Sequence, residues 1–206
     1  MNVFTRINIA LLILIPMCLI VGHVNDGALD WKVNQISTYA AKAPHDNWIT
    51  AGMAISVLLL LSMSIVVQNL IPNRWIGTCI SQIYAISAGG LLLLTIKEET
   101  VSGTSNLMKN GKLSYQQGFH DGGLGLFCAG AILALVLTGA VLVCIEKSWR
   151  RVVAGMLLLT PFGVVGSLIQ INTDEVGLYQ RAAFFCLWMG CFFLTILQNN
   201  QLSSNS

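Results

Sequence analysis

Charged side chains are scarce in this sequence: 10% of its 206 residues are Asp, Glu, Lys or Arg, and 55% are hydrophobic. A soluble domain carries about 25% charged residues, because they coat its surface. So few charges exclude an ordinary soluble globule, and a net charge of +2 gives no sign of nucleic-acid binding. The charges gather between long apolar runs, so the chain is predicted to be a polytopic membrane protein.

Motifs of several common enzyme chemistries are also missing. The sequence has no H-E-x-x-H, no P-loop and no dinucleotide-binding glycine fingerprint. Its six cysteines form no C-x-x-C pair and lie in or beside apolar runs, so they are predicted to be small packing residues and not disulfides or zinc ligands. The three histidines lie at run ends or in loops, which argues against haem between helices.

Six apolar runs approach the ~20 residues that a helix needs to cross a bilayer. They predict an all-α fold with a single domain over residues 1–206, a bundle of six transmembrane helices at about 7–22, 48–67, 75–96, 122–145, 152–171 and 182–197. No small-residue cleavage site follows the first run, so it is predicted to stay as a helix that is broken or bent at Pro16. Pro161 is expected to bend the fifth helix.

Small and amide residues inside the runs are expected to mediate helix packing, because they let backbones approach closely or hydrogen-bond across helices. The small residues are Gly89 with Gly90, Gly125 with Ala129, Gly130 with Ala134, and Gly163 with Gly166. Gln82 and Gln170 are expected to bridge helices.

The density of basic residues predicts the orientation. Glu146–Arg151 holds three of them and Asn172–Gln180 holds none. Both termini are therefore predicted to be cytoplasmic, in a bacterial inner membrane. The outer side would then collect all three histidines and eight of the nine acids.

His120 and Asp121 stand at the mouth of the fourth run, in the stretch YQQGFHDGGLG. Asp121 would cap the fourth helix and complement its dipole. Alternatively, His120 would be a ligand or general base, oriented by a nearby acid such as Asp121 or Glu98.

Arg181 lies just inside the last run, more than one turn deep if its helix begins near Val176. A guanidinium there either snorkels to lipid phosphate or needs a partner. The second alternative is an ion pair with Glu98, Glu99 or Asp121 that fixes the sixth helix to the third and fourth.

The first outer loop carries Ile36-Ser37-Thr38-Tyr39 ahead of Pro44-His45-Asp46-Asn47. No G-x-S-x-G turn surrounds Ser37, so it is no evident nucleophile. The loop is predicted to fold back onto the bundle, which makes Ser37, Tyr39 and Asp46 candidate binding residues with Arg181 and Glu99.

Three short motifs carry a family resemblance: Ile36-Ser37 before the second helix, Phe119-His120-Asp121 opening the fourth, and Gly177-Leu178-Tyr179-Gln180-Arg181 opening the sixth. With these the chain resembles a family of prokaryotic six-helix membrane proteins known as a domain of unknown function (nine-nine-eight). Lys97-Glu98-Glu99 departs from the Pro and Asp that such proteins often carry after the third helix. The resemblance implies fold and topology and supplies no activity.

Two functions follow from these residues. The first is a binding or accessory protein with a polar site at the outer leaflet, whose partner is membrane lipid, a small ligand or another membrane protein. The alternative is a metal-dependent membrane hydrolase with catalytic candidates His120, Asp121 and Glu98 and a divalent metal held by His120, His45 and His23. That site needs at least three converging ligands.

Overall fold

The structure is a computed structural model that describes residues 3–24, 32, 36, 46–95, 115–169 and 175–203, with the backbone alone at 46, 115–121, 176 and 200–203. Its helices are α1 (Val3–Val24), α3 (Asp46–Leu70), α4 (Arg74–Leu94), α6 (Tyr115–Ile145), α7 (Ser148–Ile169) and α8 (Val176–Ser203). Six helices in this part of the chain are long and apolar enough to cross a membrane. The predicted all-α six-helix membrane bundle is confirmed.

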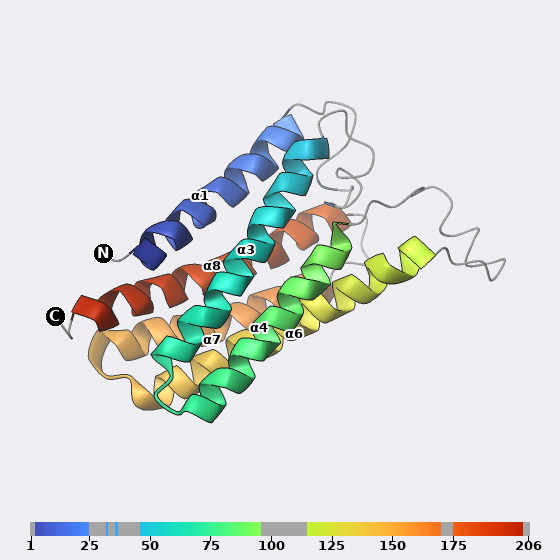
Figure 1. The fold of residues 1–206 in the computed structure, drawn as a ribbon. Helices are drawn as coiled ribbons and strands as arrows, with labels where there is room; N and C mark the ends of the chain where they lie inside the picture. The colour runs from blue at the N-terminus through green and yellow to red at the C-terminus, as the bar shows by residue number, and fades with distance from the viewer. Residues whose placement is uncertain are drawn as a thin grey trace.

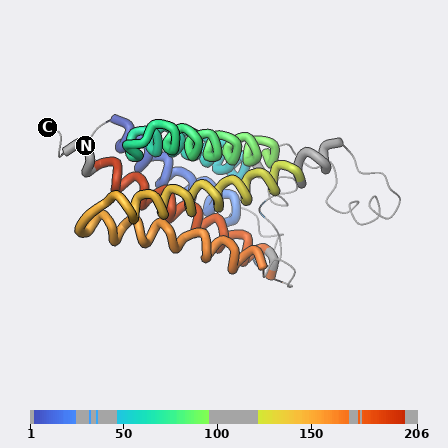
Figure 2. The backbone as a smooth tube through the Cα atoms, turned by 90° about the horizontal axis from the view of Figure 1, so that it is seen from below, coloured from blue at the N-terminus to red at the C-terminus, as the bar shows by residue number. Residues whose placement is uncertain are grey.

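The helices form a bundle in which neighbours along the chain pack side by side (Figure 1). α3 also contacts α8, and α1 packs against both α3 and α8. Viewed from below, α7 and α8 lie on one side of the bundle and α3 and α4 on the other (Figure 2). This arrangement gathers α1, α3 and α8 around one interior region, where the candidate site lies.

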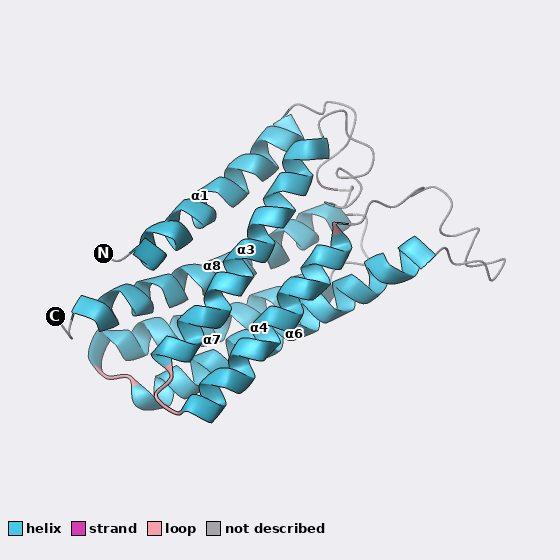
Figure 3. Ribbon diagram, viewed as in Figure 1, coloured by secondary structure: helices cyan, strands magenta, loops and turns pink. Residues whose placement is uncertain are grey.

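Both chain termini lie at one end of the bundle, together with the short connections 71–73 and 146–147 (Figure 3). We call this the terminal end. The opposite end carries the last turn of α1 and the first turns of α8 (Figure 1). We call it the Arg181 end.

All six helices begin before the apolar stretches that predicted them, because a helix keeps its backbone hydrogen bonds satisfied into the interface. α8 begins at Val176, six residues before the predicted start. α6 begins at Tyr115, so His120 and Asp121 lie in its second turn. The prediction that Asp121 caps this helix is therefore wrong.

Neither internal proline breaks its helix. α1 is continuous through Pro16 and α7 through Pro161. Transmembrane helices tolerate proline because neighbouring groups satisfy the freed carbonyls. A break at Pro16, one of the two alternatives, is therefore wrong, and the bends at Pro16 and Pro161 stay predictions.

The backbones of α4 and α6 approach each other closely. A Cβ at Gly90 would stand 2.5 Å from the amide nitrogen of Phe127, and one at Gly123 would stand 2.7 Å from the carbonyl oxygen of Gly90. Ser87 Oγ donates to the carbonyl of Phe127 at 2.9 Å. Glycine is required here because the two backbones touch.

The small residues predicted to pack divide into two groups. Gly90, Gly130, Ala134 and Gly163 contact neighbouring helices as expected. Beta carbons at Gly89, Gly125 and Gly166 would meet nothing within 4 Å, and Ala129 is exposed, so these four positions do not mediate packing among the residues that the structure describes.

All six cysteines are free. Cys18 and Cys191 are buried, and Cys128 and Cys186 are partly buried, as packing residues should be. Cys79 and Cys144 are exposed, so the predicted packing role is wrong for these two.

Buried polar side chains cross-link the helices at places the sequence did not single out. Ser62 Oγ donates to Asn8 Oδ1 at 2.5 Å, and Asn8 Nδ2 donates to Gln198 Oε1 at 3.4 Å, which joins α3, α1 and α8. Gln82, predicted to bridge helices, is exposed and makes no such bond to the described residues. Gln170 lies outside the described residues.

Candidate functional site

Arg181 and His23 meet at the Arg181 end of the bundle. Arg181 Nε donates to His23 Nε2 at 3.0 Å, and the Nη2 group contacts the same ring nitrogen. Arg181 Nη1 donates to the carbonyl of Gly177, one turn earlier in α8, at 2.7 Å. The contact ties the last turn of α1 to α8 and fixes the direction of the guanidinium.

Two contacts of the His23 ring indicate its tautomer. Nε2 faces two guanidinium nitrogens, which carry only donors, so Nε2 must accept. Nδ1 contacts the carbonyl oxygen of Leu19, which can only accept, so Nδ1 must carry the proton. His23 is therefore a neutral imidazole with its proton on Nδ1.

Two described residues between α1 and α3 contact the start of α8. The amide of Ile36 donates to Gln180 Oε1 at 2.6 Å, and the carbonyl of Lys32 accepts from the amide of Leu178 at 2.9 Å. Ile36 is only 2% exposed. At these two positions the predicted folding-back of the first loop onto the bundle is confirmed.

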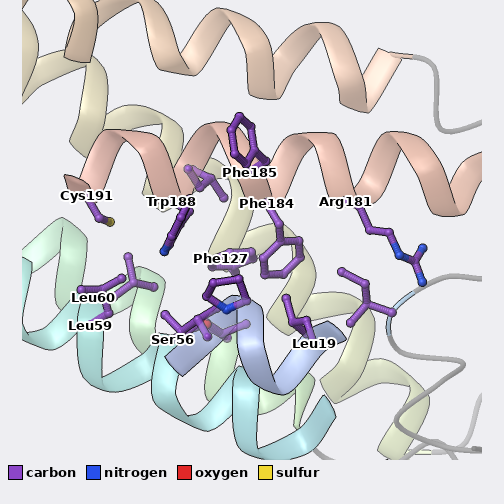
Figure 4. Close-up of a pocket in the computed structure, with 15 residues that line it drawn as sticks. Leu19, Ser56, Leu59, Leu60, Phe127, Arg181, Phe184, Phe185, Trp188 and Cys191 are labelled. Atoms are coloured by element: carbon purple, nitrogen blue, oxygen red, sulfur yellow. The ribbon is translucent and has the colours of Figure 1, made fainter. Parts of the chain in front are cut away.

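An apolar cavity of about 230 Å³ opens beside Arg181, between α8 and the helices α1 and α3 (Figure 4). Leu19 of α1, Leu59 and Leu60 of α3, and Phe127 of α6 line it opposite Phe184 of α8. The rings of Phe127 and Phe184 are stacked at a tilt, with centroids 5.4 Å apart. The wall is almost wholly apolar, so the cavity suits a hydrocarbon ligand.

A second space of about 300 Å³ adjoins the first at the end of α1. Ile20, His23 and Val24 line it, and it shares Leu19, Ile36 and Arg181 with the first cavity. Arg181 thus stands at the junction of the two spaces. Together their volumes fall within the roughly 300–1,000 Å³ of ordinary ligand sites.

Trp188 supplies a polar atom deep in the first cavity. Its indole Nε1 is buried and has no hydrogen-bond partner among the described residues. Figure 4 shows this nitrogen directed from α8 toward α3, where Ser56 and Leu60 lie. Ser56 Oγ already donates to the carbonyl of Gly52 at 2.8 Å.

Of the residues proposed from the sequence, the structure brings together Arg181 and His23. Ser37, Tyr39, His45, Glu98 and Glu99 lie outside the described residues. The backbones of Asp46, His120 and Asp121 are helical, but their side chains lie outside the described part. The predicted ion pair between Arg181 and an acid therefore remains a prediction.

The described residues contain no group of three His, Cys, Asp or Glu side chains that could hold a metal. His23 is poorly placed as a ligand, because a metal on Nε2 would have to displace Arg181. A zinc site built on His23 is therefore disfavoured.

The sequence contained a signal for the cavity that its motifs did not reveal. Arg181, Phe184, Trp188 and Cys191 follow one another at intervals of three, four and three residues, which places them on one face of a helix. All four line the cavity. A search for a helix face with a cation at one end and aromatic rings below it would have found them.

Comparison with known proteins identifies a family. The profile of the family described as "Protein of unknown function (DUF998)" matches residues 9–197. No curated protein and no solved structure matches the chain.

Proposed function

Because the chain belongs to the DUF998 family, whose description names no activity, we propose its function from the site itself: the protein binds an anionic amphiphile within the membrane. In this proposal Arg181 holds the anionic headgroup. The apolar cavity below it holds the hydrocarbon chain.

The observation that carries the proposal is the position of Arg181 at the junction of two spaces. Its guanidinium is held in direction by its contacts with His23 and with the carbonyl of Gly177. An oriented guanidinium suits carboxylate or phosphate oxygens, because its planar fork donates two parallel bonds. The cavity beyond it is lined by aliphatic and aromatic side chains, which favour transfer of a hydrocarbon chain out of water.

We further propose that this site faces the outer leaflet of a bacterial inner membrane. The support is the distribution of basic residues, since Arg74, Lys147, Arg150 and Arg151 all lie at the terminal end. Positive residues in short loops favour the cytoplasm. An amphiphile would then enter the site from the outer leaflet.

The ligand chemistry can come from a fatty acid or from an anionic phospholipid. Binding of radiolabelled stearate to the protein in detergent, with phosphatidylglycerol or methyl stearate as competitor, distinguishes them. If unlabelled stearate displaces the labelled stearate and phosphatidylglycerol does not, the ligand is a fatty acid. If phosphatidylglycerol also displaces it, the ligand is an anionic phospholipid. Equal competition by neutral methyl stearate would contradict the proposal, because Arg181 would then play no part.

Arg181→Gln is expected to weaken binding by about tenfold to a hundredfold, because a hydrogen bond to a charged group is worth about 1.5–3 kcal/mol. Arg181→Lys should recover only part of the loss, because lysine lacks the planar fork. Arg74→Gln, at the exposed terminal end, is the matched control and should bind normally. Metal-dependent cleavage of methyl stearate by the protein would instead favour the hydrolase alternative.

A further inference from the structure

Resting on the proposed function, we infer that the bound amphiphile carries a hydrogen-bond-accepting oxygen part-way along its hydrocarbon chain, and that the indole N–H of Trp188 donates to it. The ligand class is thereby narrowed to long acyl chains with a mid-chain hydroxyl or keto group. Trp188 is then the residue that selects them over plain chains.

The first step is the state of the Trp188 indole. Its Nε1 is buried without a partner among the described residues. An indole nitrogen can only donate, and buried donors in folded proteins are almost always paired. An unpaired donor that is directed into a ligand cavity therefore points to an acceptor on the ligand.

The cavity wall offers little else to satisfy this donor. Besides Arg181, the polar side chains of the wall are Ser56 and Cys191. The Ser56 hydroxyl donates to Gly52 and accepts no bond from the indole, and a thiol is only a weak acceptor. A buried water needs about 2–4 polar partners, whereas a ligand oxygen held in place by its own chain needs only one donor. An otherwise apolar ligand with one oxygen at this depth fits the wall.

The spacing along α8 sets the position of that oxygen. Trp188 follows Arg181 by seven residues, which is about 10 Å along the helix axis at a rise of about 1.5 Å per residue. The ester carbonyls of a phospholipid lie immediately below its headgroup and are too close to the anion. An oxygen near the middle of an acyl chain has the required separation from a carboxylate.

The test compares two ligands that differ by one hydroxyl, stearate and a hydroxystearate with the hydroxyl near mid-chain, by equilibrium binding to the full-length protein in detergent. The wild-type protein should bind hydroxystearate about twofold to tenfold more tightly, the range of one neutral hydrogen bond. Trp188→Phe keeps an aromatic ring and should abolish this preference, so that the variant binds the two ligands with affinities equal within about twofold. Trp75→Phe, at a position 83% exposed, is the control and should keep the preference.

A second measurement does not depend on the folding of Trp188→Phe. In a variant that keeps Trp188 as its single tryptophan, the indole N–H resonance should shift with hydroxystearate and stay in place with stearate. Equal affinities of the wild type for both ligands, or equal shifts, would overturn this inference and leave the proposed function standing. Failure of both ligands to bind would overturn the two proposals together.

Discussion

At the scale of single residues, the contact between Arg181 and His23 is the feature that orients the candidate site. A protonated imidazole would repel the guanidinium, so the contact requires the neutral ring with its proton on Nδ1. The carbonyl of Leu19 accepts from Nδ1 and so fixes this tautomer. In metal sites the second ring nitrogen of a ligating histidine is fixed by a hydrogen-bond acceptor in the same way. In this protein the His23 ring accepts from a guanidinium and not from a metal, and it orients the side chain of Arg181.

His23→Ala is expected to lower the thermal stability of the protein and to weaken amphiphile binding, because Arg181 loses an acceptor that fixes its direction. The loss of a bond to a charged group is worth about 1.5–3 kcal/mol when buried and less at this part-exposed position. The measurement is the melting temperature in detergent. Val24→Ala changes the neighbouring residue, 76% exposed, and is the control. Equal melting temperatures would contradict the orienting role.

At the scale of helices, the contact between α4 and α6 depends on glycine because backbone meets backbone. Gly89 and Gly90 are adjacent in α4, yet a Cβ on Gly90 would meet Phe127 and Gly123, whereas one on Gly89 would meet nothing within 4 Å. Substitution of alanine at each of these two glycines therefore distinguishes the effect of packing on stability from the effect of helix propensity.

Gly90→Ala is expected to destabilise the protein by about 1–3 kcal/mol, the usual cost of overpacking. Gly89→Ala should be neutral or stabilising by up to about 1 kcal/mol, because alanine is the better helix former. Unfolding in mixed micelles with increasing denaturing detergent measures both. If the two variants unfold together at lower detergent, backbone contact is not the reason for glycine at position 90.

The buried polar cluster of Asn8, Ser62 and Gln198 links three helices near the terminal end. Asn8→Ala is expected to cost about 0.6–1.7 kcal/mol for each hydrogen bond lost, as is typical inside membranes. Asn69→Ala, at an exposed position of α3, should leave stability unchanged under the same unfolding assay. Similar losses in both variants would show that the buried cluster contributes nothing specific.

At the scale of the whole molecule, an even number of spans returns the chain to its starting side. Both termini and the connections 71–73 and 146–147 share the terminal end (Figure 3). Whichever way the protein is inserted, these four places must lie on one side of the membrane. The Arg181 site then lies toward the other side.

A reporter fused after Ser206 should read cytoplasmic, and so should one within Glu146–Arg151, because basic residues in short loops are retained there. A tag between Thr104 and Lys112 should be labelled by an impermeant reagent from outside. Opposite labelling of all three would invert the bundle and place the amphiphile site at the inner leaflet. Termini on different sides would contradict the six-span bundle itself.

The sequence alone determined the fold class and nearly all of the helix positions, because long apolar runs with few charges have one stable form in lipid, the helix. It also singled out Arg181, since a charge inside a membrane-length run demands a partner. It misplaced the starts of α6 and α8, because polar residues ahead of an apolar run are equally compatible with a loop and with additional helical turns.

Only the tertiary structure decided that Arg181 meets His23, 158 positions away in the sequence, and that an apolar cavity opens beside them. It also decided that Gly90 packs against α6 whereas Gly89 does not. In the same way, the amide of Asn8 is buried and hydrogen-bonded whereas that of Gln82 is exposed. The physical reason is that lipid is as apolar as the bundle interior, so hydrophobicity does not tell a lipid-facing surface from a helix interface. The rotation of each helix about its own axis is set by its packing against neighbours. This rotation directs Trp188 of α8 into the cavity.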